Sequence, residues 1–154
     1  MTNGPTTDGP TTDGPTASDP AAVIRHDQFL AHPPAAVWAA LTTPDLMARW
    51  WVPGDVRPVV GHHFTLDMGT WGQQPATVTA VEPERLLRYT FAEGTLDTTI
   101  TWRLEPEGRG TRLFLEHADF DLDSPLGRQA LEGMGRGWPG LVRNLERKLT
   151  AALT

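Results

Sequence analysis

Two adjacent histidines, His62 and His63, are the first residues in this chain whose type suggests chemistry. Histidine is a common metal ligand and a common general acid or base. The pair begins an alternating run, 62–68, that predicts a β-strand, and neighbours on a strand point to opposite faces. Both side chains therefore cannot hold one metal ion, and we expect no metal site here. One of the two can still face a cavity and form a hydrogen bond to a ligand.

Three aspartates at alternate positions, Asp119, Asp121 and Asp123, resemble the opening of a calcium-binding loop. Such a loop needs glycine at its sixth position and glutamate at its twelfth, where this chain has Ser124 and Ala130. The better interpretation is a solvated connection between a strand and a helix.

His117 is the best candidate for a catalytic acid or base, because its strand places it on the same face as Leu113 and Leu115. The alternative is a buried histidine whose ring is satisfied by a backbone carbonyl. The chain has no cysteine, which excludes disulfides, zinc–thiolate sites and cysteine nucleophiles. It also has no motif of a serine nucleophile. We therefore expect no cofactor, and enzymatic activity is the less favoured interpretation.

Three glycines at alternate positions invite comparison with a phosphate-binding loop. Gly133, Gly135 and Gly137 follow helical residues rather than a strand, and no Lys-Ser or Lys-Thr pair comes after them, so they do not form a phosphate-binding loop. We predict close packing of a helix against its neighbours at these glycines.

Trp50 and Trp51 end a short helical segment. Since two adjacent side chains cannot point the same way, one of them is expected to line the mouth of a pocket.

The composition of the chain excludes several classes of protein. At 154 residues and a net charge of −6, the chain has no basic stripe, which argues against nucleic-acid binding. No apolar run approaches the roughly 18 residues that cross a membrane, and the N-terminus lacks the features of a signal peptide. We expect a cytoplasmic protein that does not insert into membranes. Residues 1–20 repeat Gly, Pro, Thr and Asp and are predicted to be a disordered tail, and 21–154 to be a single domain.

The elements that position the candidate residues follow from apolar periodicity. Residues 21–31 predict a strand. Pro34 and Pro44 fit the first positions of two short helices, with Thr43 as the cap of the second. Alternating runs then predict antiparallel strands joined by short turns, at 62–68, 76–81, 86–91, 98–104 and 111–117.

The last predicted element is a long amphipathic helix over 125–153, capped by Ser124. The glycines and Pro139 within it predict a kink or a restart near Gly137-Trp138. The whole order predicts an α+β fold, in which a curved antiparallel sheet of about six strands wraps around this helix. The two short helices lie between the first and second strands. Such an arrangement can leave a cavity between sheet and helix.

Several short motifs occur in a recognisable order along residues 22–153: Pro34-x-x-Val37-Trp38-x-Ala40-Leu41-Thr42-x-Pro44, Arg49-Trp50-Trp51, Gly61 with Phe64, Glu82-Pro83-x-Arg85-Leu86, Gly110-Thr111-Arg112-Leu113 with His117, and Gly137-Trp138 with Leu141 and Leu145. Together they resemble the START-like superfamily with the helix-grip fold, and within it the branch related to the activator of Hsp90 ATPase. His62 and Ala76 depart from that pattern, since a glycine is common at both positions.

The resemblance implies that the cavity holds a small hydrophobic ligand, bound by burial of apolar surface. The predicted lining residues lie on the apolar faces of the strands and helices: Trp51, Phe64, Leu66, Tyr89, Ile100, Trp102, His117, Met134 and Trp138. Tyr89 and His117 would supply the orienting hydrogen bonds. One alternative is a cyclase-, aromatase- or hydrolase-type enzyme, with His63, Tyr89 and His117 as its acid or base. Another is a stress-response adaptor related to Hsp90 ATPase activators. A monomer or a homodimer is expected.

Overall fold

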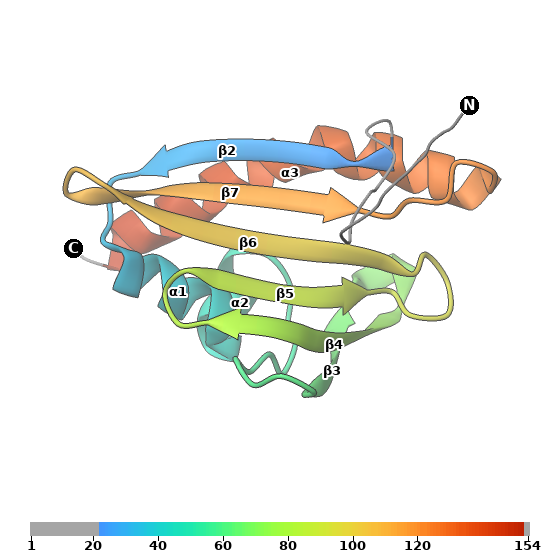
Figure 1. The fold of residues 1–154 in the computed structure, drawn as a ribbon, viewed down its shortest axis with the longest axis horizontal. Helices are drawn as coiled ribbons and strands as arrows, with labels where there is room; N and C mark the ends of the chain where they lie inside the picture. Colours follow the sequence, from blue (N-terminus) through green and yellow to red (C-terminus); the bar gives the residue numbers. More distant parts are fainter. Residues whose placement is uncertain (1–21, 153–154) are drawn as a thin grey trace, which may run out of the picture.

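The computed structural model describes residues 22–152, and the predicted tail over 1–20 lies outside them. The described part contains one antiparallel sheet with the strand order β2-β7-β6-β5-β4-β3, crossed on one face by a long helix (Figure 1). The strands are β2 (Ile24–Leu30), β3 (His63–Asp67), β4 (Gln73–Glu82), β5 (Leu86–Phe91), β6 (Thr98–Glu107) and β7 (Gly110–Ala118). This arrangement confirms the predicted α+β helix-grip fold.

Two short helices, α1 (Pro34–Thr42) and α2 (Pro44–Trp50), connect β2 to β3. Each begins at a proline, as predicted, because the first helical position needs no N–H donor. Thr43 occupies the N-cap position of α2, as predicted, but its side chain makes no capping hydrogen bond. Pro44 and the acidic Asp45 in the first turn are the favourable features that remain at this end of α2.

The apolar alternation of the strands decides which face of the sheet is buried. β6 and β7 form a long hairpin that turns at Gly108, whose φ of 56° favours glycine. On the inner face of these two strands Trp102, Leu113 and His117 are fully or almost fully buried. β2 pairs with β7, so the first strand lies beside the last one.

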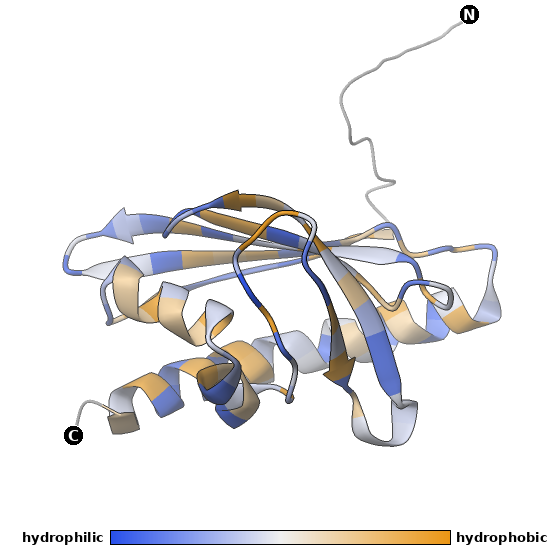
Figure 2. Cartoon of the chain, turned by 90° about the horizontal axis from the view of Figure 1, so that it is seen from below, coloured by the Kyte–Doolittle hydropathy of each residue, from blue (hydrophilic) through white to orange (hydrophobic). Residues whose placement is uncertain are grey.

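The helix α3 (Pro125–Ala152) runs along the inner face of the sheet (Figures 1 and 2). Ser124 caps it as predicted, because its hydroxyl accepts the N–H of Gly127 at 3.2 Å. Of the kink or restart predicted near Gly137-Trp138, the restart is wrong, since the helix continues without interruption through Pro139. The kink stays a prediction.

The two halves of α3 are covered unequally. In the C-terminal half, Val142, Leu145 and Leu149 are buried, whereas Leu131 and Met134 in the N-terminal half are only partly buried. α1 and α2 lie at the C-terminal end of α3 (Figure 2). Within residues 22–152, no helix combines the length and the apolar character needed to cross a membrane.

Candidate functional site

A pocket of about 710 Å³ lies against the N-terminal half of α3. One wall is α3 itself, from Leu126 to Leu141. The opposite wall consists of two turns, the one between β3 and β4 and the one between β5 and β6. The floor is made of aromatic side chains. The pocket therefore occupies the part of the inner face that α1 and α2 leave uncovered.

Three aromatic rings from three different elements form the floor. Trp51 directly follows α2, Phe91 ends β5, and Trp138 comes from the middle of α3. The ring centroids of Trp51 and Trp138 are 5.1 Å apart, and those of Trp51 and Phe91 are 6.3 Å apart. Trp50 is buried instead, and its indole N–H donates to the carbonyl of Ala40 at 2.9 Å. Of the two adjacent tryptophans, only Trp51 lines the pocket.

His117 lies directly behind this floor and is completely buried. The indole N–H of Trp138 donates to its Nδ1 at 3.1 Å, so Nδ1 is an acceptor and the proton is on Nε2. Nε2 then donates to the Thr98 hydroxyl at 2.8 Å, which in turn donates to the carbonyl of Phe91. Burial lowers the pKa of His117 to about 3. The imidazole is thus neutral and fully hydrogen-bonded, and it fixes two of the three floor residues.

His117 therefore lies on the inward face, as the sequence predicts. The groups that satisfy its ring are the Trp138 indole and the Thr98 hydroxyl, not a backbone carbonyl as the alternative interpretation held.

The glycines of α3 shape the pocket wall. Gly133 and Gly137 both line the pocket, and a Cβ placed on either would meet no atom within 4 Å. Of Gly133, Gly135 and Gly137, only Gly135 has a neighbour within 4 Å of an added Cβ, namely Ile24 at an ordinary distance of 3.8 Å. The prediction of close packing at these glycines is wrong for Gly133 and Gly137, which face open space.

The two turns that form the opposite wall are tied together. Gln74 donates its amide N–H to the carbonyl of Trp71 at 2.7 Å, and its amide oxygen accepts the Thr95 hydroxyl at 3.2 Å. Trp71 is 68% exposed at this side of the pocket, and Leu126, on the α3 side, is 45% exposed. The mouth thus carries two of the largest exposed apolar side chains in the described part of the chain.

Three of the predicted ligand-binding residues, Trp51, Met134 and Trp138, line the pocket. The other six are buried in the core beside or behind it: Phe64, Leu66, Tyr89, Ile100, Trp102 and His117. Among them, the Trp102 indole N–H donates to the Tyr89 hydroxyl at 2.9 Å, and burial raises the pKa of that phenol. A direct contact between any of these nine residues and a ligand stays a prediction.

Several lining residues were not among those predicted. Phe91 lies on the alternating apolar face of β5, and Met68 directly follows β3 and continues the apolar alternation of residues 62–68, so the sequence contained a signal for both. Trp71 ends a short 3-10 helix, Gly69–Trp71, and Leu126 lies in the first turn of α3. In neither place does periodicity mark a side chain as facing a pocket.

The adjacent histidines do not line the pocket. His62 approaches the carbonyl of Asp55 at 2.6 Å, before β3 begins. His63 lies on β3 and donates from Nδ1 to the Thr77 hydroxyl at 2.7 Å, because that hydroxyl's own proton is directed to Glu93. In residues 22–152, no three His, Cys, Asp or Glu side chains are grouped as a metal site requires.

Glu93 is the acceptor for this small polar cluster. Its Oε2 accepts the hydroxyl of Thr90 at 2.5 Å and that of Thr77 at 2.7 Å. These two hydrogen bonds, the one from Thr90 first, lower the pKa of the Glu93 carboxyl. The cluster fastens the start of the turn between β5 and β6 to the outer face of the sheet.

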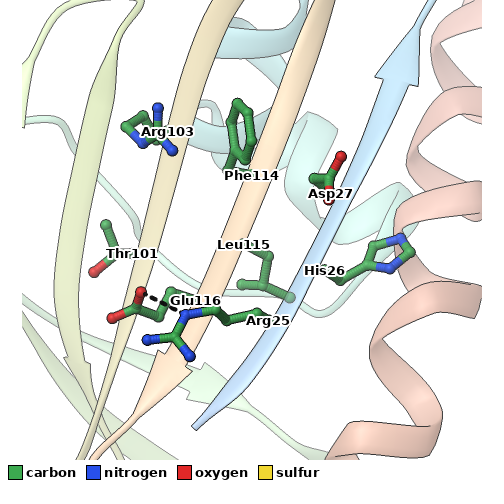
Figure 3. Close-up of a pocket in the computed structure, with 8 residues that line it drawn as sticks. All are labelled: Arg25, His26, Asp27, Thr101, Arg103, Phe114, Leu115 and Glu116. Atoms are coloured by element: carbon green, nitrogen blue, oxygen red, sulfur yellow. Dashed lines mark ion pairs between the residues drawn. The ribbon is translucent and has the colours of Figure 1, made fainter. Parts of the chain in front are cut away.

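A second, smaller hollow of about 200 Å³ lies on the outer face of β2, β7 and β6 (Figure 3). Its charged side chains already have partners. Arg25 pairs with Glu116 at 3.5 Å, and the Arg103 guanidinium lies 4.1 Å from the centre of the Phe114 ring. Such paired side chains are typical of a solvated sheet face, so the pocket beside α3 is the better candidate site.

Comparison with other proteins agrees with this architecture. The crystal structure of protein MLL2253 from Mesorhizobium loti is 32% identical, with a TM-score of 0.75, and the match covers 84% of this chain and 97% of that one. CalU16 from Micromonospora echinospora is 30% identical, with a TM-score of 0.69, covering 88% and 83%. The Aha1 dimer from Colwellia psychrerythraea, at 21% identity and a TM-score of 0.70, covers 82% and 95% and shares the fold.

No curated protein matches the chain. The family described as activator of Hsp90 ATPase homolog 1-like protein matches residues 31–150, which includes both short helices, all strands after β2 and nearly all of α3. The chain therefore belongs to the activator of Hsp90 ATPase homolog 1-like family, in the START-like branch that its motifs resemble.

Proposed function

We propose that this protein binds a small hydrophobic molecule in the pocket between α3 and the two turns. The observation that carries the proposal is the pair of glycines, Gly133 and Gly137, on the pocket wall. Each glycine destabilises a helix by about 1 kcal/mol relative to alanine. Neither is needed for a close contact, since a Cβ would meet nothing within 4 Å. What the two glycines provide is open volume beside an aromatic floor.

The size and chemistry of the pocket fit such a ligand. Its volume of about 710 Å³ is within the range of small-molecule sites. A ligand that buries about 200 Å² of apolar surface there gains about 5 kcal/mol from burial, before the loss of its own freedom is subtracted. The rings of Trp51, Phe91 and Trp138 provide rigid apolar surface at little cost in side-chain entropy.

An enzymatic role is not favoured by any residue of the described pocket. The predicted acid or base, His117, is completely buried, and both ring nitrogens already have partners. Tyr89 is likewise buried, beneath Trp102, and His63 lies outside the pocket. The adaptor role, the cytoplasmic location and the choice between monomer and homodimer stay predictions.

The test compares two glycine substitutions on the same helix. Gly133→Leu places a side chain in the pocket, whereas Gly140→Leu lies outside it and meets only the flexible Arg143 at 3.6 Å. Both substitutions remove a helical glycine, so both are expected to raise the free energy of unfolding by about 1 kcal/mol. Binding of the neutral fluorescent dye phenylnaphthylamine should be lost or strongly weakened in Gly133→Leu and unchanged in Gly140→Leu.

Native mass spectrometry of the purified wild-type protein adds a direct search for a bound small molecule. Two results would overturn the proposal. One is a wild-type protein that carries no small molecule and binds neither the dye nor any member of a lipophilic panel. The other is equal dye binding by Gly133→Leu and Gly140→Leu, because the dye would then bind elsewhere.

A further inference from the structure

We propose that the ligand carries an anionic group of the carboxylate type, held at the pocket rim by Arg136 while its apolar part lies on the aromatic floor. This inference rests on the proposed function and adds the chemical class and the orientation of the ligand. Three features carry it: a floor nearly without free polar groups, an ion pair at the rim, and an excess of unused hydrogen-bond donors.

The floor and the turn side of the pocket offer a ligand few polar partners. The indole N–H of Trp138 is already donated to His117. Gln74 and Thr95 bond to each other, and Gln74 also donates to the carbonyl of Trp71. On the floor, the exception is the indole N–H of Trp51, which makes no hydrogen bond within the described residues. A polar group on the ligand therefore finds most of its partners on α3.

The polar side chains of the α3 wall lie on successive turns of the helix. Gln129, Glu132 and Arg136 all line the pocket. Arg136 Nη1 is 3.6 Å from Glu132 Oε2, which is close enough for an ion pair but too long for a hydrogen bond. The two side chains are 72% and 73% exposed, so the pair contributes little stability. The guanidinium thus lies beside Glu132 at the rim, and a ligand can recruit it at small cost.

The balance of donors and acceptors favours an anion. Arg136 has five N–H donors in a planar fork, none hydrogen-bonded within the described residues. The indole N–H groups of Trp51 and Trp71 and the side-chain amide of Gln129 add further donors to the pocket lining. The one anionic side chain of the lining is Glu132. A guanidinium matches a carboxylate or sulfonate by two parallel hydrogen bonds, a geometry that a neutral ligand cannot use as well. An apolar molecule with one such anion at its end satisfies both parts of the site.

A pair of dyes with the same apolar rings tests the inference. Anilinonaphthalene sulfonate carries an anion, and phenylnaphthylamine is its neutral counterpart. Arg136→Gln should weaken binding of the sulfonate by about three- to fivefold and leave the neutral dye unchanged. Glu132→Gln should strengthen binding of the sulfonate. Arg143→Gln makes the same change of charge on α3 outside the pocket and should alter neither dissociation constant.

The outcomes separate this inference from the function on which it rests. If wild type binds both dyes and Arg136→Gln leaves the ratio of their dissociation constants unchanged, the anionic class is overturned and the hydrophobic pocket stands. If Arg143→Gln changes that ratio as much as Arg136→Gln does, the effect is long-range and the assignment to Arg136 is overturned. If wild type carries no small molecule and binds neither dye nor any member of the lipophilic panel, the proposed function fails and this inference fails with it.

Discussion

The buried imidazole of His117 predicts a specific dependence of stability on pH. Its pKa is about 3 in the folded protein, compared with 6.5 for an exposed histidine. Between these values the unfolded chain binds a proton that the folded chain does not, so stability falls as the pH is lowered through this window. From pH 7 to pH 5, His117 alone should reduce the free energy of unfolding by about 2 kcal/mol.

Urea denaturation followed by tryptophan fluorescence measures this loss directly. The wild-type protein is compared with His117→Asn at several pH values between 5 and 7. The other four histidines are common to both proteins, so the difference between the two curves isolates His117. The range from pH 5 to pH 7 also avoids the contributions of Glu93 and Glu107. Because the pKa values of both carboxyls are lowered in the folded protein, their contributions to stability are lost below about pH 4.5.

We expect His117→Asn to be less stable than wild type at pH 7, because it loses the bond to Thr98 and leaves a void. Its free energy of unfolding should nevertheless fall less steeply with pH, so the two curves converge toward pH 5. Parallel curves would refute the reasoning. If the variant does not fold, the NMR signals of the His117 ring give a second test. Their chemical shifts should stay at the values of a neutral imidazole down to pH 5. A titration midpoint near pH 6.5 would equally refute the reasoning.

Two further predictions concern stability. Gly127→Ala should lower the free energy of unfolding by about 2 kcal/mol or more, because its Cβ would lie 2.1 Å from the carbonyl oxygen of Asp121. Thermal unfolding measures this loss, with Gly133→Ala as a control that should be stabilised. Glu93→Gln should cost under about 1 kcal/mol at pH 7 and flatten the loss of stability below about pH 4.5, since the pKa of Glu93 is lowered in the folded state and its contribution disappears as it is protonated. The second prediction would be contradicted if urea unfolding showed the same loss of stability below about pH 4.5 in Glu93→Gln as in wild type.

The fold was predictable because the apolar periodicity of the segments agrees with the positions of the prolines and glycines that begin and end them. Pro34 and Pro44 mark the starts of α1 and α2, and the alternation over 98–104 and 111–117 gives the hairpin and its inner face. The predicted restart in α3 failed because local propensity is a weak constraint on a helix that packs along a sheet. The sequence shows the local cost of Gly133, Gly137 and Pro139, not the tertiary contacts that offset it.

The site was predictable only in part, because alternation identifies the inner face but not what covers each position on it. Trp102 and Trp138 share that face, yet Trp102 is enclosed by Trp50 and Trp138 while Trp138 also lines the pocket. Whether a helical glycine touches a neighbour or faces open space depends on the distance between two elements remote in sequence. No local pattern encodes that distance, and Gly133 was therefore misinterpreted.

The pairing of β2 with β7 also bears on how the chain folds. Ile24 lies opposite His117 and Leu30 opposite Thr111, so β2 finds its partner only after every other strand has been made. Contacts between residues so far apart require a large loop to close, which slows folding. On the ribosome, β2, α1 and α2 emerge long before β7 and α3 can cover them. During that interval the apolar face of α1 and the unpaired edge of β2 are open to chaperones, and also to the same segments of other nascent chains.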